Sequence, residues 1–302
     1  VKEFEMKKAA DQYARAATSK TGKLDLNKVY TYKYNDDLFA KVTTLPGATN
    51  HGMVIFIDWS GSMVHNMLGT IKQLFNLMWF CQRVKIPFEV YAFSNRYERT
   101  EYRDGMWRRV PRVFQTPKVG DFIIDDLHLL NFFSSNMSTT EFNQMLNNVY
   151  TLGHSWNNRY GRRMLQAPRQ YDLGGTPLDS TIVAAMNILP KFKSDTGVQK
   201  VNTIFLTDGD SHPIENYYDL DEKTETKVPR FVSRRDALVI TDPVTNKTIK
   251  NDSYDSGDYS RYRTVRTSIY LQFLKYRVPG MNVVGFFVAG SGKNGTVPRL
   301  SL

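Results

Sequence analysis

The segment Met53–Asp58 (MVIFID) is a continuous apolar run that ends in an aspartate. A strand without polar alternation is covered on both faces, so this run predicts a central strand of a largely parallel sheet. Further strand-like runs lie at 88–94, 201–210 and 282–290, with helical patterns between them. Strands that alternate with helices predict an α/β fold, with a mostly parallel central sheet and helices on both faces.

Four helical patterns accompany these strands. The first is apolar nearly all round and is expected to be buried. The second begins with a capping box from Ser138 to Glu141, and the third has Pro177 in its first turn, where proline is tolerated. The patterns lie at 67–84, at about 138–152, at 177–189 and at 264–277.

Residues 1–51 are expected to form an N-terminal helix and a lead-in segment. Lys2–Ala17 has the composition of a short charged helix, and Gly22 is the kind of residue that ends one. The mixed pattern of Thr21–Thr43 predicts a lead-in packed on the main domain. The first residue is Val1, so we expect that upstream residues have been removed or left out.

The main domain is expected to cover 52–302. It carries two insertions longer than a simple crossover requires, at about 95–171 and 211–263. The second contains ALVITDPVTNKTIK (237–250), which predicts a β-hairpin. Only twelve residues follow the last apolar run, so we expect a helix that would cover that strand to lie outside the sequence.

Composition narrows the classes of function. The single cysteine, Cys81, lies in an apolar helical run, which predicts a buried, inert thiol and fits a reducing cytoplasm. The five histidines show no metal-ligand spacing, so zinc is not expected. No apolar stretch is long enough to span a membrane.

The formal net charge of +10 permits attraction to nucleic acid, an anionic membrane or an acidic protein. Much of the surplus arginine lies in short clusters that are best explained as solvated loops, with an acidic protein partner as the next choice. The clusters are Arg108, Arg109 and Arg112; Arg159, Arg162 and Arg163; and Arg230, Arg234 and Arg235.

Three loops at predicted strand ends carry oxygen-bearing side chains. Asp58, Ser60 and Ser62 occupy alternate positions of DWSGSM, Thr176 follows two glycines, and Asp208 closes the strand in LTDGD. Open α/β sheets bind ligands at the carboxyl edge of their strands. Two carboxylates and three hydroxyls are hard donors, which suit Mg²⁺ or Mn²⁺. The alternative is that these residues only shape turns and cap helices.

In this order, DWSGSM, GGT and LTDGD resemble the metal-ion-dependent adhesion site (MIDAS) of von Willebrand factor A (VWA) domains. The resemblance covers about 52–290 and implies a Rossmann-like VWA fold. It also implies that Ser60, Ser62 and Thr176 contact the ion, Mg²⁺ or otherwise Mn²⁺ or Ca²⁺, and that Asp58 and Asp208 act mostly through water. With only two carboxylates, the ion would stay electrophilic and accept a carboxylate from another protein.

Other titratable residues have simpler explanations. Asp210 and His212 are expected at the surface and not as ligands. Asp125 and Asp126, within FIIDDLHLL, could be mistaken for a catalytic pair, but no partner motif accompanies them. A role at a strand end or a helix cap is expected for both.

The lead-in and its spacing to IDWSGSM also resemble the VWA subunit of cobalt-chelatase-type systems, the CobT-like group, including versions carried by bacteriophages. Members of that group work beside a hexameric AAA+ ATPase of the MoxR or CobS kind. This chain lacks the long acidic region usual in that group and is basic, which argues against chelatase chemistry. The partnership with an ATPase remains an expectation.

Four functions remain open at this point. The first is a cytoplasmic, non-enzymatic adaptor that grips an acidic residue of an AAA+ ATPase or its client through the metal. The second is a structural or virion-associated phage protein that binds through its insertions. A metal-dependent hydrolase ranks below both, because no base or nucleophile motif accompanies the site. Nucleic-acid binding lacks a known module, and AGSGKNG (289–295) lacks the P-loop spacing.

Overall fold

The computed structural model divides the chain into two compact units, Val1–Asn50 and His51–Leu302. The described residues are 2–3, 6, 17–24, 39–44, 51–95, 100–109, 118–124, 127–156, 168–209, 211–232, 237–251 and 259–288.

The N-terminal unit contains an antiparallel pair of strands. Strand β1 (Ala17–Leu24) pairs with β2 (Phe39–Thr44), and the register shifts between Lys20 and Leu24. The β-branched residues Thr18 and Val42 favour this extended pairing. The prediction that a helix ends near Gly22 is wrong, because β1 runs through that glycine. Residues 2, 3 and 6 are helical, and the rest of the predicted helix before Ala17 lies outside the described residues.

A five-stranded sheet forms the centre of the second unit. Its order is β13–β8–β3–β4–β7, and neighbours are parallel except β7, which runs antiparallel to β4. The prediction of an α/β fold with a mostly parallel sheet is therefore confirmed. The strands are β3 (His51–Asp58), β4 (Phe88–Ser94), β7 (His128–Ser134), β8 (Lys200–Thr207) and β13 (Asn282–Phe287).

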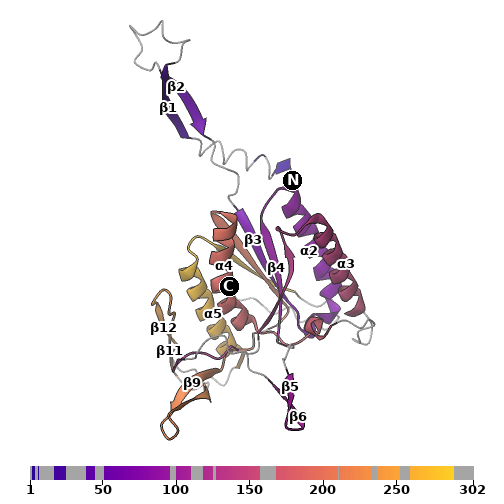
Figure 1. Cartoon of the computed structure of the whole chain (residues 1–302), viewed down its shortest axis with the longest axis vertical. Helices are drawn as coiled ribbons and strands as arrows, with labels where there is room; N and C mark the ends of the chain where they lie inside the picture. The colour runs from indigo at the N-terminus through magenta and orange to yellow at the C-terminus, as the bar shows by residue number, and fades with distance from the viewer. Residues whose placement is uncertain are drawn as a thin grey trace. The chain divides into compact units, whose positions relative to one another are not determined.

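Helices cover both faces of this sheet, with α2 and α3 on one side and α4 and α5 on the other (Figure 1). Short 3-10 turns accompany them at Ser62–His65 and Arg169–Tyr171. The helices are α2 (Met67–Arg83), α3 (Thr139–Trp156), α4 (Leu178–Thr196) and α5 (Tyr259–Arg277). Each of the four predicted helices is thus present.

Three helices differ from their predictions in extent or burial. The fully buried helix expected at 67–84 is amphipathic instead, because Trp79 and its neighbours on one face of α2 are exposed. Helix α4 continues through Pro190 to Thr196, and Gly197 ends it in a left-handed conformation with φ of 67°. Helix α5 begins earlier than predicted, at Tyr259.

The start of α3 shows the predicted capping box. The main-chain N–H of Ser138 donates to Oε2 of Glu141 over 2.9 Å, and the N–H of Glu141 donates back to Oγ of Ser138 over 3.3 Å. These reciprocal bonds satisfy amide groups that the first turn of a helix leaves open. The main-chain N–H and the hydroxyl of Ser138, which both donate to Oε2, also hold the pKa of Glu141 below its usual range.

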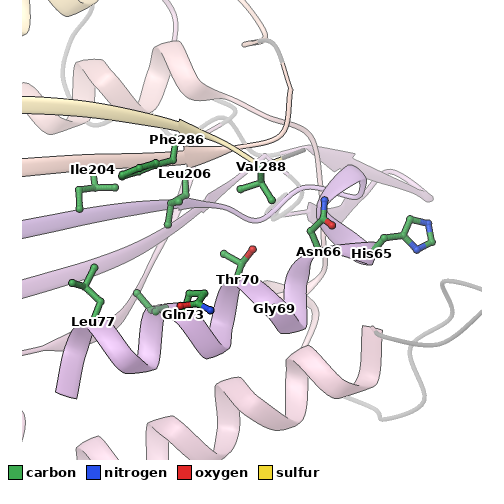
Figure 2. A pocket seen from close by; sticks show the side chains of 11 residues that line it. His65, Asn66, Gly69, Thr70, Gln73, Leu77, Ile204, Leu206, Phe286 and Val288 are labelled. Carbon is green, nitrogen blue, oxygen red and sulfur yellow. The ribbon is translucent and has the colours of Figure 1, made fainter. Parts of the chain in front are cut away.

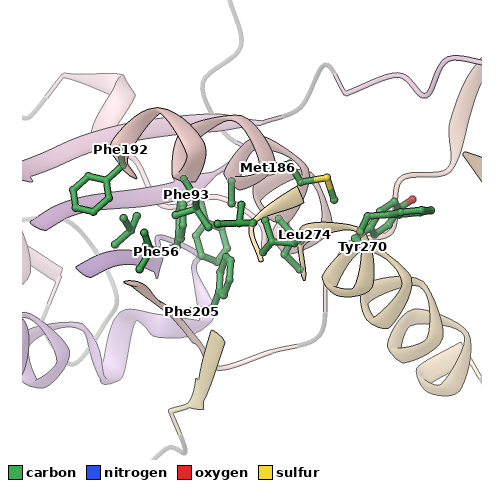
Figure 3. Packing of buried hydrophobic residues seen from close by; sticks show 14 of the residues in the cluster. Phe56, Phe93, Met186, Phe192, Phe205, Tyr270 and Leu274 are labelled. Carbon is green, nitrogen blue, oxygen red and sulfur yellow. The ribbon is translucent and has the colours of Figure 1, made fainter. Parts of the chain in front are cut away.

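An apolar core lies between the sheet and the α4–α5 layer (Figure 3). Phe56 of β3 stacks on Phe205 of β8, with ring centroids 4.9 Å apart. Phe192 of α4 and Leu274 of α5 belong to the same buried cluster. Residues 54–58 of β3 are almost wholly buried, as the apolar run predicted for a strand covered on both faces.

In the described part of the second unit, three hairpins lie outside the sheet, and the sequence predicted only the last of them. The β5–β6 pair follows β4, whereas the other two follow β8. They are β5 (Thr100–Arg103) with β6 (Met106–Arg109), β9 (Asn216–Asp221) with β10 (Thr226–Phe231), and β11 (Leu238–Thr241) with β12 (Thr248–Asn251).

The two insertions contact each other. The N–H of Gly120 donates to the carbonyl of Tyr218 over 2.7 Å, and the N–H of Ile123 donates to that of Asn216 over 2.8 Å. Phe122 and Tyr217 form an isolated antiparallel bridge. These bonds join a described part of the first insertion to β9 of the second.

A groove of about 760 Å³ separates α2 from strands β8 and β13 (Figure 2). Gln73 and Leu77 lie on its helical wall, and Ile204, Leu206 and Phe286 lie on the strand side. Phe286 keeps half of its surface exposed. Strand β13 is thus less covered than β3 in the part of the chain that the structure describes.

No helix within the described residues is both long enough and apolar enough to cross a membrane.

Candidate functional site

The candidate site lies where the strand order of the sheet reverses. From β3 the chain moves outward through β4 to β7, returns to β8 on the other side of β3, and then adds β13. The carboxyl ends of β3 and β8 therefore lie side by side, and their outgoing loops part in opposite directions. In open α/β sheets this switch point is where ligands bind.

Asp58, the last residue of β3, is completely buried. Its Oδ2 accepts a hydrogen bond of 2.8 Å from Oγ1 of Thr207, the last residue of β8. Its Oδ1 has no hydrogen-bond partner among the described residues. A buried carboxylate oxygen without a donor is uncommon and calls for an explanation, such as an ion.

Burial sets the electrostatics of this carboxyl group. It raises the pKa of Asp58 to about 6, because the charged form loses its hydration. The nearby hydroxyls of Thr207, Ser60 and Thr176 oppose the rise in pKa, whereas the negative charge of Asp208 adds to it. A cation beside Asp58 would remove this electrostatic penalty.

Two serines connect the loop after β3 to Asp208. Oγ of Ser60 and Oγ of Ser62 lie 2.9 Å apart, and Oγ of Ser62 donates to Oδ1 of Asp208 over 2.7 Å. Gly61 between them donates its N–H to the carbonyl of Gly174 over 2.9 Å. The serine turn is therefore fixed to the glycines that precede Thr176.

The loop before α4 brings Thr176 to the same place. Ser60 and Gly174 form an isolated parallel bridge, and Gly174 donates its N–H to the carbonyl of Trp59 over 3.1 Å. Thr176 is largely buried, and its hydroxyl lies near enough to Asp58 to lower the pKa of that carboxyl. Its main-chain carbonyl accepts the N–H groups of Leu178 and His212.

The structure thus brings all five predicted residues together, from three loops. Within the described residues, no group of three or more His, Cys, Asp or Glu side chains could hold a metal. A metal here would depend on the serine and threonine hydroxyls as well as the two carboxylates. The buried, unpartnered Oδ1 of Asp58 and this hard-oxygen donor set fit a Mg²⁺-type ion.

Three residues that hold these loops were not among the predicted site residues. Thr207 binds Asp58, and Asn95 accepts the N–H of Gly175 through Oδ1 over 2.6 Å. Ser211 accepts the N–H of the buried Asp179 through Oγ over 2.8 Å. Asn95 and Ser211 lie outside the quoted motifs, whereas Thr207 lies inside LTDGD, next to Asp208, and its position at a strand end could have drawn attention to it.

A side chain at Gly175 would collide with its neighbours. A Cβ added there would lie 2.6 Å from Cε1 of His212 and 2.8 Å from Nδ2 of Asn95. His212 is exposed, as predicted, but its ring borders this glycine and hence the site. Gly175 therefore gives both side chains room beside Thr176.

Several other predicted positions are partly or wholly outside the described residues. Asp125, Asp126 and Asp210 are among them, as is 289–295. Of the arginine clusters, the structure describes Arg108, Arg109 and Arg230, and Arg230 pairs with Asp219 on the surface. Cys81 is buried as predicted, and burial raises the pKa of its thiol to about 11.

Comparison with known proteins assigns no family. No family profile and no curated protein matches the chain. The pilus adhesin SpaC from Lactobacillus rhamnosus GG, in its open conformation, superposes with a TM-score of 0.37 and 14% identity, covering 81% of this chain and 25% of the adhesin. Another form of that adhesin gives 0.32 and 14%, over 81% and 26%. The chain thus spans about a quarter of the adhesin, and a likeness this weak carries no functional argument.

Proposed function

We propose that residues 51–302 form a VWA-type domain whose five clustered residues hold one Mg²⁺-type ion, and that the chain binds other proteins through that ion. The observation that carries this proposal is the hydrogen-bonded series Ser60–Ser62–Asp208 beside a buried Asp58 with an unpartnered oxygen. Turn formation alone would not require a carboxylate that is buried and only half satisfied.

The order of the strands supports the Rossmann-like part of this proposal. Numbered along the chain, the five strands of the sheet stand in the order 3-2-1-4-5, which the doubly wound dinucleotide-binding fold also uses for its first five. The antiparallel β7 is a departure from a fully parallel sheet. The three loops leave the sheet at one edge, and this supports the proposal of a MIDAS there.

Each of the five residues would have the role that the resemblance implies. Ser60, Ser62 and Thr176 would contact the ion directly, and Asp58 and Asp208 would act mostly through water. Such an ion supplies a positive charge with open coordination positions. Since the protein provides only two carboxylates, a carboxylate from a partner protein would be a favourable additional ligand.

We propose binding and not catalysis as the role of this site. Both carboxylates of the cluster are assigned to the ion, so neither is left to transfer a proton to or from a substrate. The resemblance to the CobT-like group suggests that the partner is a MoxR- or CobS-like AAA+ ATPase or its client, in the cytoplasm of a bacterium or a phage-infected cell.

The decisive experiment is a pull-down from the native source with the purified chain as bait. We expect an AAA+ ATPase to be recovered with Mg²⁺ and lost with EDTA. Asp58→Ala and Asp208→Ala should abolish recovery, whereas Asp195→Ala, which alters an exposed aspartate in the last turn of α4, should not. Circular dichroism confirms that each variant is folded.

The outcome also distinguishes the second candidate, a structural or virion-associated phage protein. The contact between the two insertions favours this alternative, because it joins them into a shared surface beside β9. Binding that survives both EDTA and Asp58→Ala would contradict the metal-dependent adaptor and support assembly through the insertions.

A further inference from the structure

Asp179 is a buried carboxylate that the proposed metal site does not use. It lies in the first turn of α4 and is fully inaccessible to solvent. Thr267 of α5 donates its hydroxyl to Oδ1 of Asp179 over 2.6 Å. Asp179 therefore joins the start of α4 to α5 at a point three residues after Thr176.

The main chain of Asp179 also reaches the loop that carries Asp208. Its N–H donates to Oγ of Ser211 over 2.8 Å, and Ser211 donates in turn to the carbonyl of His212 over 3.1 Å. The N–H of His212 donates to the carbonyl of Thr176 over 3.0 Å. These bonds connect the loop that carries Asp208 to the loop that carries Thr176.

The opposite end of the Asp208 loop is fixed independently. Thr207 donates to Oδ2 of Asp58 and also bonds to the main chain of Gly209. The loop from β8 is thus held to β3 at its beginning and to α4 near Ser211. Asp208 lies between the two attachments.

A buried charged residue in this position has a cost in desolvation free energy. Burial raises the pKa of Asp179 to about 6, although Thr267, Ser211 and the charges of Arg266 and Arg263 oppose the rise in pKa. Arg266 is itself buried. A neutral side chain in the first turn of α4 would avoid this desolvation.

We propose that Asp179 is a positioning residue for the metal site: it holds the Thr176 and Asp208 loops at the separation that the ion requires, braced against α5 by Thr267. This inference rests on the proposed function, since it presupposes that the cluster binds a metal. Asp179 does not contact the ion. It acts through Thr176 and Ser211.

The test measures the affinity of the folded, full-length chain for Mn²⁺ by calorimetry, alongside its thermal unfolding without metal. Thr267→Val removes the hydroxyl with little change in shape, and Asp179→Asn removes the charge. We expect each to weaken Mn²⁺ binding by about tenfold or more, the range typical of residues that orient metal ligands.

Two variants control for effects on α5 itself. Thr267→Ser keeps the hydroxyl and should restore wild-type affinity. Ser268→Ala removes the next hydroxyl along the helix, which is exposed and bonds only locally to the carbonyl of Val265. It should leave Mn²⁺ affinity unchanged.

The results separate the two proposals. If the wild-type chain fails to bind Mn²⁺, the proposed function fails. If the wild-type chain binds but Thr267→Val binds equally well, Asp179 is only structural and this inference is overturned, whatever happens to the unfolding temperature. Should Asp179→Asn not fold, the comparison of Thr267→Val with Thr267→Ser decides alone.

Discussion

The hydroxyl of Thr207 donates to Oδ2 of Asp58 over 2.8 Å and joins residues that lie 149 positions apart in the sequence. The bond connects the last residues of two adjacent parallel strands, β8 and β3. It leaves the other oxygen of Asp58 unpartnered among the described residues. The orientation of this carboxylate is therefore fixed by Thr207, a residue of LTDGD that was not among the five predicted ligands.

Replacing Thr207 tests the importance of that orientation. Thr207→Val should weaken Mg²⁺ or Mn²⁺ affinity about 10- to 100-fold, because the carboxylate of Asp58 loses the bond that directs it. Thr207→Ser, which keeps the hydroxyl, should bind like wild type. Calorimetric titration of both variants checks this, and equal affinities would contradict it.

Metal should stabilise the fold. At about one hundred times its Kd, Mg²⁺ adds about 2.7 kcal/mol, which raises the Tm of a domain this size by roughly 5 to 10 °C. Asp58→Asn should show no such rise, because an amide cannot supply the negative charge. Scanning fluorimetry with Mg²⁺ and with EDTA makes the comparison, and an equal rise in both proteins would contradict the site.

The free energy of unfolding should depend on an ion pair between α5 and the β11–β12 hairpin. Arg277 binds Oδ1 of Asp242 through Nε over 2.9 Å and also through its second terminal nitrogen. Both side chains are largely buried, so Arg277→Ala should cost about 3 kcal/mol in urea unfolding. Arg230→Ala, which breaks the exposed pair with Asp219, should cost less than about 1 kcal/mol.

The same ion pair predicts a loss of stability in acid. Burial alone would raise the pKa of Asp242, but bonds from Arg277 and Thr245 hold the pKa well below its usual range. A lowered native pKa gives stability that is complete above the unfolded-state pKa, about 3.9, and is lost as the pH falls further. Arg277→Ala should therefore flatten the acid limb of the stability profile, and an unchanged limb would argue against the pair.

The raised pKa of Asp179 predicts the opposite pH dependence of the free energy of unfolding. Its native pKa is about 6, whereas an unfolded aspartate has a pKa of about 3.9, so its stabilising contribution is complete below pH about 4 and is lost as the pH rises through about 6. In EDTA, the free energy of unfolding of the wild type should fall as the pH rises from about 4 to about 6. Asp179→Asn should make this fall about 3 kcal/mol smaller. Urea unfolding across this range measures the difference, and an unchanged slope would refute it.

The thiol of Cys81 should be unreactive in the native protein. It is 1% exposed, and burial raises its pKa to about 11, so little thiolate forms at neutral pH. A thiol reagent should label Cys81 only at the rate of unfolding. Ser194→Cys adds an exposed thiol on α4 that should react at once in the same tube, and rapid labelling of wild type would contradict the prediction.

Local sequence patterns were sufficient to predict the elements that have a strong apolar pattern or a capping signal. The run before Asp58 became a buried strand, and Ser138 and Glu141 formed their capping box at the start of α3. Two weaker signals gave wrong boundaries. Gly22 lies inside a strand because β1 pairs with β2, and α4 continues past Pro190, where Phe192 belongs to the buried core.

The sequence alone determined which side chains could form a metal site. One predicted strand ends in Asp58 and another ends just before Asp208, and the loops that follow parallel neighbouring strands leave the sheet at the same edge. Tertiary structure alone decided what surrounds them. The bonds from Thr207 to Asp58 and from Thr267 to Asp179 join segments 149 and 88 residues apart. Such contacts depend on strand order and helix packing, which no local pattern encodes.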